Sequence, residues 1–314
     1  MNNRIKLTAM SRTLLADLQT PVGIYLKVRD MFPESALLES SDYHSSENSY
    51  SFIGIEPIAR FTVDRGQVAE QYPDRTCRSY PLTEKTGLPD ALNAFIRRFE
   101  IAGDTRSDNG FFGYTTYDAV QYFENVRIES RPAAETETPE MIYILYRFVI
   151  AVNHLRNEMT VTENLAEGET GRMDSLLGIL ASRNFPTYGF RAAGPVASPI
   201  TDEEHKANVR EGIRHCMRGD VFQIVLSRRF SQGFAGDDFN VYRALRSINP
   251  SPYLFYFDFG SFRIFGSSPE THFKVEGDVA TIDPIAGTVK RTGNDAEDER
   301  LAQQLLADPK ENAE

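Results

Sequence analysis

The sequence predicts an α+β protein in which antiparallel β-sheets are sandwiched with flanking helices. Short apolar strands dominate the 314 residues, and glycine-containing turns join several of them as hairpins. Helical periodicity is confined to a few segments that lie between groups of strands. This order favours antiparallel sheets over a doubly wound parallel sheet.

Two helices and one pair of strands are predicted in the first region, residues 1–183. Pro89–Phe99 and Gly171–Ser182 each place apolar side chains three and four residues apart, the spacing of a helix with one buried face. Between them, Met141–Val152 is rich in β-branched and aromatic residues and is predicted to be a strand. A turn then leads into residues 159–161 as its partner.

A domain linker is predicted at residues 184–199, which contain three prolines, two glycines and little periodicity. The second region, residues 200–314, begins with a helix. Thr201 can cap that helix, and Glu204 three residues later completes a capping box. Gly219 is expected to end it.

Strands are expected to dominate the rest of the second region. Val221–Phe230 is predicted to be a strand, and two hairpins are predicted at 253–265 and 271–282. A loop at 283–298 then precedes a helix that starts near Glu299. The helix that begins at Thr201 is expected to bury an apolar stripe formed by Val209, Ile213 and Cys216 or Met217.

The composition excludes several classes of protein. A formal net charge of −11 and the lack of a basic block argue against nucleic acid and anionic membranes as partners. Two distant cysteines cannot form a disulfide framework or a four-cysteine zinc site. The N-terminus has no apolar stretch typical of a signal peptide, so we expect a cytoplasmic protein.

Two turns carry residue types suited to chemistry. Glu270 follows Pro269, which restricts the backbone and suits a positioned acid. Gly287 permits a ligand to approach the backbone closely, and Thr288 offers a hydroxyl group and an N–H group. Both segments would serve equally as ordinary polar turns.

Three further side chains are candidates for a site. Glu311 and Glu314 lie three residues apart, which on a helix places both carboxylates on one face. Mg²⁺ prefers such oxygen ligands, although a solvated acidic face explains the pair as well. Gln223 alternates with apolar neighbours in its predicted strand, so its amide either faces a ligand or is a satisfied polar group in the core.

Several short segments occur in an order and spacing that resemble the anthranilate synthase component I group of the chorismate-utilising enzymes. The resemblance extends over essentially the whole chain and implies a two-layer antiparallel β sandwich flanked by helices. The segments are Leu37–Ser40, Gly113–Tyr114, Tyr117–Asp118, Asp220–Gln223, Asn249–Tyr253, Ser267–Glu270, Pro284–Thr288 and Lys310–Glu314.

The resemblance also implies roles for particular residues in Mg²⁺-dependent chemistry on chorismate. Glu270 is similar to the general acid beside the departing C4 hydroxyl group. Chorismate is a dianion, and this chain has a net negative charge. The resemblance implies that the metal ion holds the ring carboxylate, which would offset the repulsion between them. The residues implied at the substrate are Ala286, Gly287 and Thr288, and those implied at the metal are Glu311 and Glu314.

Two positions distinguish the members of this family by nucleophile. Isochorismate and salicylate synthases carry a lysine where this chain has Gln223, and aminodeoxychorismate synthases carry one where it has Ala286. With neither lysine, the resemblance implies ammonia as the nucleophile. The implied products are anthranilate and pyruvate, in the first step of tryptophan biosynthesis.

A regulatory site for tryptophan is implied between two of the matching segments, Leu37–Ser40 in the first region and Asn249–Tyr253 in the second. The implied contacts are Glu39, Ser40, Pro252, Tyr253 and Leu254. A glutamine amidotransferase subunit, component II, is the implied partner that supplies ammonia.

Other functions remain open at this point. The chain could be an aminodeoxychorismate or isochorismate synthase, although Gln223 and Ala286 argue against both. It could also be a non-catalytic module that binds tryptophan or docks a subunit. Family members continue beyond the position of Glu314, so we expect residues 200–314 to be the first part of a catalytic domain and the isolated chain to be inactive.

Overall fold

The computed structural model describes residues 4–40, 49–83, 87–103, 109–128, 138–285, 287–309 and 311. It contains both helices and mostly antiparallel sheets, which confirms the predicted α+β class. The chain forms two compact units, one from Met1–Pro186 with Leu245–Glu314 and the other from Thr187–Ala244. Residues 245–314 of the second region therefore belong to the same unit as the first region. The predicted domain linker at 184–199 stays a prediction.

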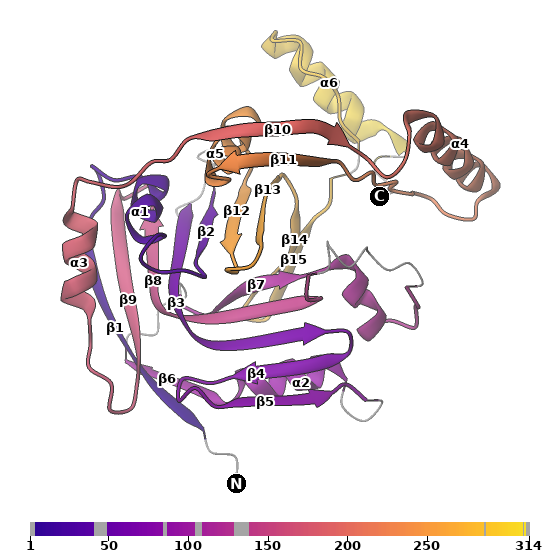
Figure 1. The fold of residues 1–314 in the computed structure, drawn as a ribbon. Helices are drawn as coiled ribbons and strands as arrows, with labels where there is room; N and C mark the ends of the chain where they lie inside the picture. The colour runs from indigo at the N-terminus through magenta and orange to yellow at the C-terminus, as the bar shows by residue number, and fades with distance from the viewer. Residues whose placement is uncertain are drawn as a thin grey trace. The chain divides into compact units, whose positions relative to one another are not determined.

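One large sheet of eleven described strands dominates the first unit (Figure 1). Eight strands follow the order β13-β12-β2-β3-β8-β9-β1-β6, and β4, β5 and β7 pair outside this path. The neighbours are antiparallel apart from the parallel pair β1 and β6. The strands are β1 (Ile5–Leu15), β2 (Ala36–Glu39), β3 (Tyr50–Asp64), β4 (Gln67–Gln71), β5 (Cys77–Pro81), β6 (Phe99–Gly103), β7 (Phe111–Thr115), β8 (Met141–Asn153), β9 (Glu158–Ala166), β12 (Tyr253–Asp258) and β13 (Arg263–Ser268).

The two long central strands, β3 and β8, change partners along their length. The first half of β3 pairs with β2 and its second half with β4, while β8 pairs first with β7 and then with β9. The register between β3 and β8 shifts between Pro57 and Ala59. Proline cannot donate to the ladder, and such an irregularity bends and twists a strand. The bend allows one pair of strands to serve two parts of the sheet.

Short helices complete the first unit. The helix α1 (Pro21–Val28) begins where the Thr20 hydroxyl accepts a hydrogen bond from the Gly23 N–H group at 3.0 Å, and Pro21 favours its first turn. This helix was not among the predicted elements. The others are α2 (Leu88–Ile96), α3 (Met173–Ala181), α6 (Asp295–Ala307) and the 3₁₀ helix η1 (Tyr117–Tyr122).

Two apolar clusters stabilise the large sheet. In one, α2 buries Leu88 and Phe95 against Phe61 and other side chains of the β3 and β4 region. The other joins β8 to the β12 hairpin, where Tyr146 and Phe257 are buried. The second cluster explains why the β12 hairpin, although far along the chain, belongs to the first unit.

The second unit contains one helix and a two-stranded sheet. The strands β10 (Phe190–Ala197) and β11 (Ser231–Gly236) are antiparallel. The helix α4 (Asp202–Arg218) has the predicted capping box between Thr201 and Glu204, and it ends at Gly219 in the left-handed conformation. A last helix, α5 (Phe239–Ile248), begins in this unit and ends in the first.

Residues 184–199 include β10, and their role as a linker stays a prediction. Two predictions for this part of the chain are wrong. Val221–Phe230 forms no strand. The expected buried stripe of α4 is exposed, with Ile213 at 56% and Met217 at 82% of full exposure. A strand needs a partner and an apolar stripe needs a surface to cover it, and neither requirement can be read from local sequence.

The remaining local predictions are confirmed. The two helices and the strand pair of the first region form, although α2 ends at Ile96 and Phe99 begins β6 instead of ending the helix. The hairpins of β12 with β13 and of β14 (Thr271–Glu276) with β15 (Val279–Asp283) also form. The last helix, α6, begins at Asp295, four residues before the expected start at Glu299. In the described part of the chain, no helix has both the length and the apolar character needed to cross a membrane.

Candidate functional site

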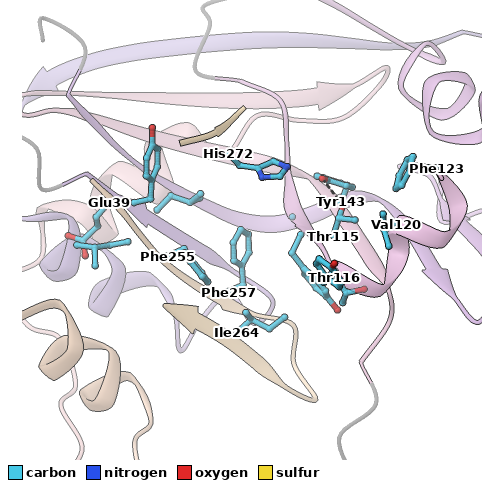
Figure 2. A pocket seen from close by; sticks show the side chains of 16 residues that line it. Glu39, Thr115, Thr116, Val120, Phe123, Tyr143, Phe255, Phe257, Ile264 and His272 are labelled. Carbon is cyan, nitrogen blue, oxygen red and sulfur yellow. Dashed lines mark hydrogen bonds between the residues drawn. The ribbon is translucent and has the colours of Figure 1, made fainter. Parts of the chain in front are cut away.

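A cavity of about 960 Å³ lies in the first unit (Figure 2). Its wall comes from β2, β12 and β13 on one side and from β7, β8 and η1 on the other. Most of the lining side chains are aromatic or aliphatic, including Tyr114, Tyr143, Phe255 and Phe257. Pockets of roughly 300–1,000 Å³ with such walls are typical of small-molecule sites.

Glu39 provides a carboxylate in this apolar wall. It ends β2, opposite Leu254 of β12, and its side chain is only 2% exposed. Arg246 on α5 places its Nε atom 3.0 Å from a Glu39 carboxylate oxygen. A buried charged side chain needs such a partner, and the pair places the Glu39 carboxyl group at the cavity wall.

The register of β2 against β12 brings together the two segments predicted to bind an inhibitor. Glu39, Tyr253 and Leu254 all line the cavity. Ser40 and Pro252 adjoin these residues in the chain but are not among the side chains that line it. Their roles in binding stay predictions.

The opposite wall contains residues to which the sequence assigned no role. Tyr114 donates a hydrogen bond to the Pro139 carbonyl oxygen at 2.7 Å, and burial raises the pKa of its phenol. The hydroxyl groups of Thr115 and Tyr143 lie 3.1 Å apart. Tyr114 belongs to a segment that was singled out only for its resemblance, and Thr115 follows it directly in β7.

Three more lining residues come from β12 and β14. Phe255 and Phe257 follow Tyr253 at alternate positions of β12, so the three side chains share one face of the strand. This alternation was the sequence signal that could have identified them. His272 of β14 also lines the cavity (Figure 2), and no local pattern pointed to it.

Glu270, the predicted general acid, lies between β13 and β14 and is exposed. Its N–H group donates to the Ser268 hydroxyl oxygen at 3.3 Å. The next residue, Thr271, has its hydroxyl oxygen 2.5 Å from that of Tyr253. Glu270 itself does not line the cavity. The Ser268 and Tyr253 hydroxyl groups of these two contacts belong to β13 and β12, which form part of the cavity wall.

Gly287 and Thr288 line a second cavity, of about 510 Å³, beside α6. A Cβ atom at Gly287 would lie 2.2 Å from a carboxylate oxygen of Glu311, so glycine permits this side chain to approach. Two of the predicted site segments therefore meet here. Ala286 and Glu314 lie outside the described residues.

The described residues alone do not form a Mg²⁺ site. Mg²⁺ needs near-octahedral oxygen coordination and commonly uses more than one protein carboxylate. Of the two predicted ligands, the structure describes Glu311 only. Within the described ranges, no group of three or more His, Cys, Asp or Glu side chains is arranged to hold a metal ion.

Gln223 belongs to the second unit, in the exposed segment between α4 and β11. The prediction that it lies on a strand is wrong, because residues 221–230 have no regular structure. Its predicted role in selecting the nucleophile did not depend on that strand and stays a prediction.

The sequence and the fold match one family of enzymes. The profile of the family described as chorismate binding enzyme matches residues 34–314. The chain therefore belongs to the chorismate binding enzyme family.

Individual proteins of known name are similar to this chain over most of its length. The anthranilate synthase component 1 of Pseudomonas aeruginosa is 34% identical and is matched by 99% of this chain, which spans 65% of the relative. The solved structure of anthranilate synthase component I from Streptococcus pneumoniae TIGR4 is 25% identical, with a TM-score of 0.63 over 96% of this chain and 65% of that one. The menaquinone-specific isochorismate synthase from Escherichia coli shares the fold at 16% identity, with a TM-score of 0.62 over 99% of this chain and 61% of that one.

Proposed function

We propose that this chain is the chorismate-converting component of an anthranilate synthase. The observation that carries the proposal is the family match over residues 34–314, together with relatives named anthranilate synthase component 1 at 31–34% identity. The glutamine at position 223 and the alanine at position 286 support ammonia over water as the nucleophile.

The proposed reaction joins ammonia to C2 of chorismate and breaks the C4–O bond. Glu270 donates a proton to the departing C4 oxygen, which leaves as water. Loss of the C2 proton and cleavage of the C3–O bond then release pyruvate and leave aromatic anthranilate. The exposed position of Glu270, on a turn stiffened by Pro269, supports this role because the acid must reach a bound ligand.

Ammonia is proposed to come from glutamine through a glutamine amidotransferase subunit. Free ammonia attacks without a general base once it is unprotonated, so an ammonium salt should replace the partner in an assay. The expected result is activity with ammonium alone, and activity with glutamine only after the partner subunit is added.

Mg²⁺ dependence is part of the proposal and rests on the resemblance. Glu311 and Glu314 would be ligands, and the bound ion would neutralise a carboxylate of chorismate. Glu314→Ala should raise the Mg²⁺ concentration that gives half-maximal activity, whereas Glu297→Ala, on α6 but outside the lining of the second cavity, is the matched control. An unchanged Mg²⁺ titration in Glu314→Ala would remove this residue from the metal site.

The activity assay should use two proteins, because the chain spans only 65% of the Pseudomonas aeruginosa relative. One is the chain itself, and the other is a chimaera that adds the part of the relative beyond the match to Glu314. Chorismate, ammonium and Mg²⁺ should give fluorescent anthranilate with the chimaera. If a folded chimaera consumes no chorismate, the proposed function is wrong.

A second candidate reaction is isochorismate formation, because the chain shares its fold with the Escherichia coli isochorismate synthase. Chromatography of the products separates the two reactions, since water would yield isochorismate without pyruvate. Gln223→Lys in the chimaera should depress anthranilate formation. Parental anthranilate formation by this variant would show that Gln223 does not face the approaching nucleophile.

We also propose that the 960 Å³ cavity binds tryptophan as a feedback inhibitor. The Glu39 carboxylate suits an ammonium group, and the aromatic wall suits an indole ring. The chain contains no tryptophan, so the fluorescence of the added ligand reports binding directly. Glu39→Gln should weaken binding roughly tenfold or more, because it removes a charged hydrogen-bond acceptor. Binding of equal strength in this variant would contradict the assignment.

A further inference from the structure

Tyr253 connects the cavity to the segment that carries Glu270. Its ring lines the cavity, and its hydroxyl oxygen lies 2.5 Å from that of Thr271. Thr271 follows Glu270 directly in the chain. A side chain that a cavity ligand would touch is therefore hydrogen-bonded to the neighbour of the proposed general acid.

The segment around Glu270 joins two paired strands, β13, which ends at Ser268, and β14, where Thr271 lies opposite Asp283 of β15. Pro269 and Glu270 are both exposed, so packing does not fix the position of the carboxylate. On the N-terminal side, the Glu270 N–H group donates to the Ser268 hydroxyl group. Ser268 is paired with Tyr253 in the register of β13 against β12. The same tyrosine thus lies beside both ends of the segment.

The preceding residue of β13 ties this region to the turn that leads into β12. The Ser267 hydroxyl group donates to the Asn249 carbonyl oxygen at 2.6 Å. Asn249 follows α5, whose Arg246 pairs with Glu39. This second set of contacts fixes β13 at Ser267, while β14 is paired with β15, where Thr271 lies opposite Asp283. The Tyr253–Thr271 hydrogen bond links these two parts.

We propose that Tyr253 is a positioning residue through which a ligand in the cavity controls the placement of Glu270. The proposal rests on the proposed function, because the ligand is the tryptophan assigned to this cavity and Glu270 is the assigned acid. Tyr253 is 43% exposed, so protein packing covers only part of its side chain. A ligand packed against it favours the ring orientation in which the Tyr253–Thr271 hydrogen bond is formed, and that bond holds the Glu270 segment in one arrangement.

The physical requirement for such control is an element with two arrangements that the ligand distinguishes. The hydrogen bond between the two hydroxyl groups is that element, since it is either formed or broken. Its loss removes the link between Thr271 and β12, and Thr271 then keeps its pairing with Asp283 of β15. Site-to-site coupling of this kind commonly amounts to roughly 5–150-fold in an equilibrium constant.

Hydrogen–deuterium exchange of the 314-residue chain, with and without tryptophan, tests the proposal. In the unmodified chain, saturating tryptophan should slow exchange in peptides covering 268–272 by about fivefold or more. Tyr253→Phe keeps the ring in the cavity but removes the hydroxyl group, and Thr271→Val removes the partner hydroxyl group from outside the cavity. Thr271→Val should bind tryptophan within about threefold of the parent, because Thr271 does not line the cavity, and Tyr253→Phe is compared at its own saturating tryptophan concentration. Both should lose the slowing at 268–272.

Two further variants make the test specific. Tyr143→Phe also removes a hydroxyl group from the cavity wall, but one that faces Thr115, so the slowing at 268–272 should persist. Thr271→Ser restores a hydroxyl group and should recover the slowing. A purely structural role for Tyr253 would change exchange equally with and without the ligand.

The outcomes separate this proposal from the one on which it rests. If tryptophan binds and both Tyr253→Phe and Thr271→Val retain the full slowing, the positioning role is refuted and the cavity assignment stands. If tryptophan does not bind the unmodified chain, the cavity assignment fails and the positioning role fails with it. Loss of the slowing in both variants, with binding retained, supports the role of Tyr253.

Discussion

Replacing Gly113 by alanine should separate β7 from β8 and distort the wall of the 960 Å³ cavity. Gly113 lies in the middle of β7, opposite Tyr143 of β8. A Cβ atom at this position would lie 1.8 Å from the Ile142 carbonyl oxygen and 2.8 Å from the Tyr143 Cα atom. These are backbone atoms, so no side-chain rotation can relieve the clash.

The magnitude follows from the displacement that the extra atom requires. Ordinary contact begins at 3.4 Å, so the strands must move apart by about 1.6 Å, the difference between that distance and 1.8 Å. Such a shift breaks the neighbouring ladder hydrogen bonds, each worth about 0.5–1.5 kcal/mol net. Overpacking adds about 1–3 kcal/mol, so we expect the free energy of unfolding to fall by about 2–4 kcal/mol.

Urea unfolding followed by circular dichroism measures this change. With a slope of about 3 kcal/mol per M urea, the unfolding midpoint of Gly113→Ala should fall by about 1 M. The matched control is Gly110→Ala, because a Cβ atom there meets no atom within 4 Å. Tyr114 and Thr115 follow Gly113 and line the cavity, so Gly113→Ala should also weaken tryptophan binding. Equal midpoints for the two variants would refute the reasoning.

Three other predictions follow from particular side chains. Glu270→Gln in the chimaera should lower turnover by about 10²–10⁴-fold with chorismate binding retained in equilibrium dialysis, and more than half the parental rate would exclude Glu270 as the acid. Arg147→Met should cost about 3–5 kcal/mol in urea unfolding, because it leaves the buried Glu163 carboxylate, 3.0 Å from the guanidinium, without its charged partner. Arg172→Ala, at a half-exposed position, should cost only about 0–1 kcal/mol, and equal losses would contradict the distinction. Burial and the charge of Arg246 lower the pKa of His154 below 6.5, so the folded state resists protonation of this imidazole. Stability from this group is therefore complete above pH 6.5 and is lost as the pH falls through the folded pKa, and His154→Asn should reduce the decrease in urea midpoint between about pH 7 and about pH 5.

Local sequence determined the elements whose stability depends on near neighbours. The helix α4 forms between the Thr201 capping box and Gly219, because caps act within one turn of the chain. The hairpins form around Gly260 and Gly277, both of which adopt positive φ angles that glycine accepts without strain. Such signals lie within a few residues of each other, so the sequence alone was sufficient to identify them.

The sequence also identified the chemistry-bearing segments, because their order and spacing match a known family. It did not reveal that Gly113–Tyr117, Phe255 and Phe257 share a cavity with Glu39. That arrangement depends on β2 pairing with β12 across more than two hundred residues of chain, and on the change of partners along β8. No local pattern encodes which distant strands will pair.

Two segments did not adopt the structure or burial that their local sequence favoured, because these depend on contacts with other segments. Residues 221–230 have the composition of a strand, but the described structure gives them no strand to pair with, and Phe222 is 91% exposed. The apolar stripe of α4 is helical as predicted, yet it is not covered by the described part of the chain. Hydrogen-bond ladders and buried faces are made between segments rather than within them. The sequence therefore determined which segments could become strands, helices and site residues, and only the tertiary structure decided which of them paired, were buried or met at the cavity.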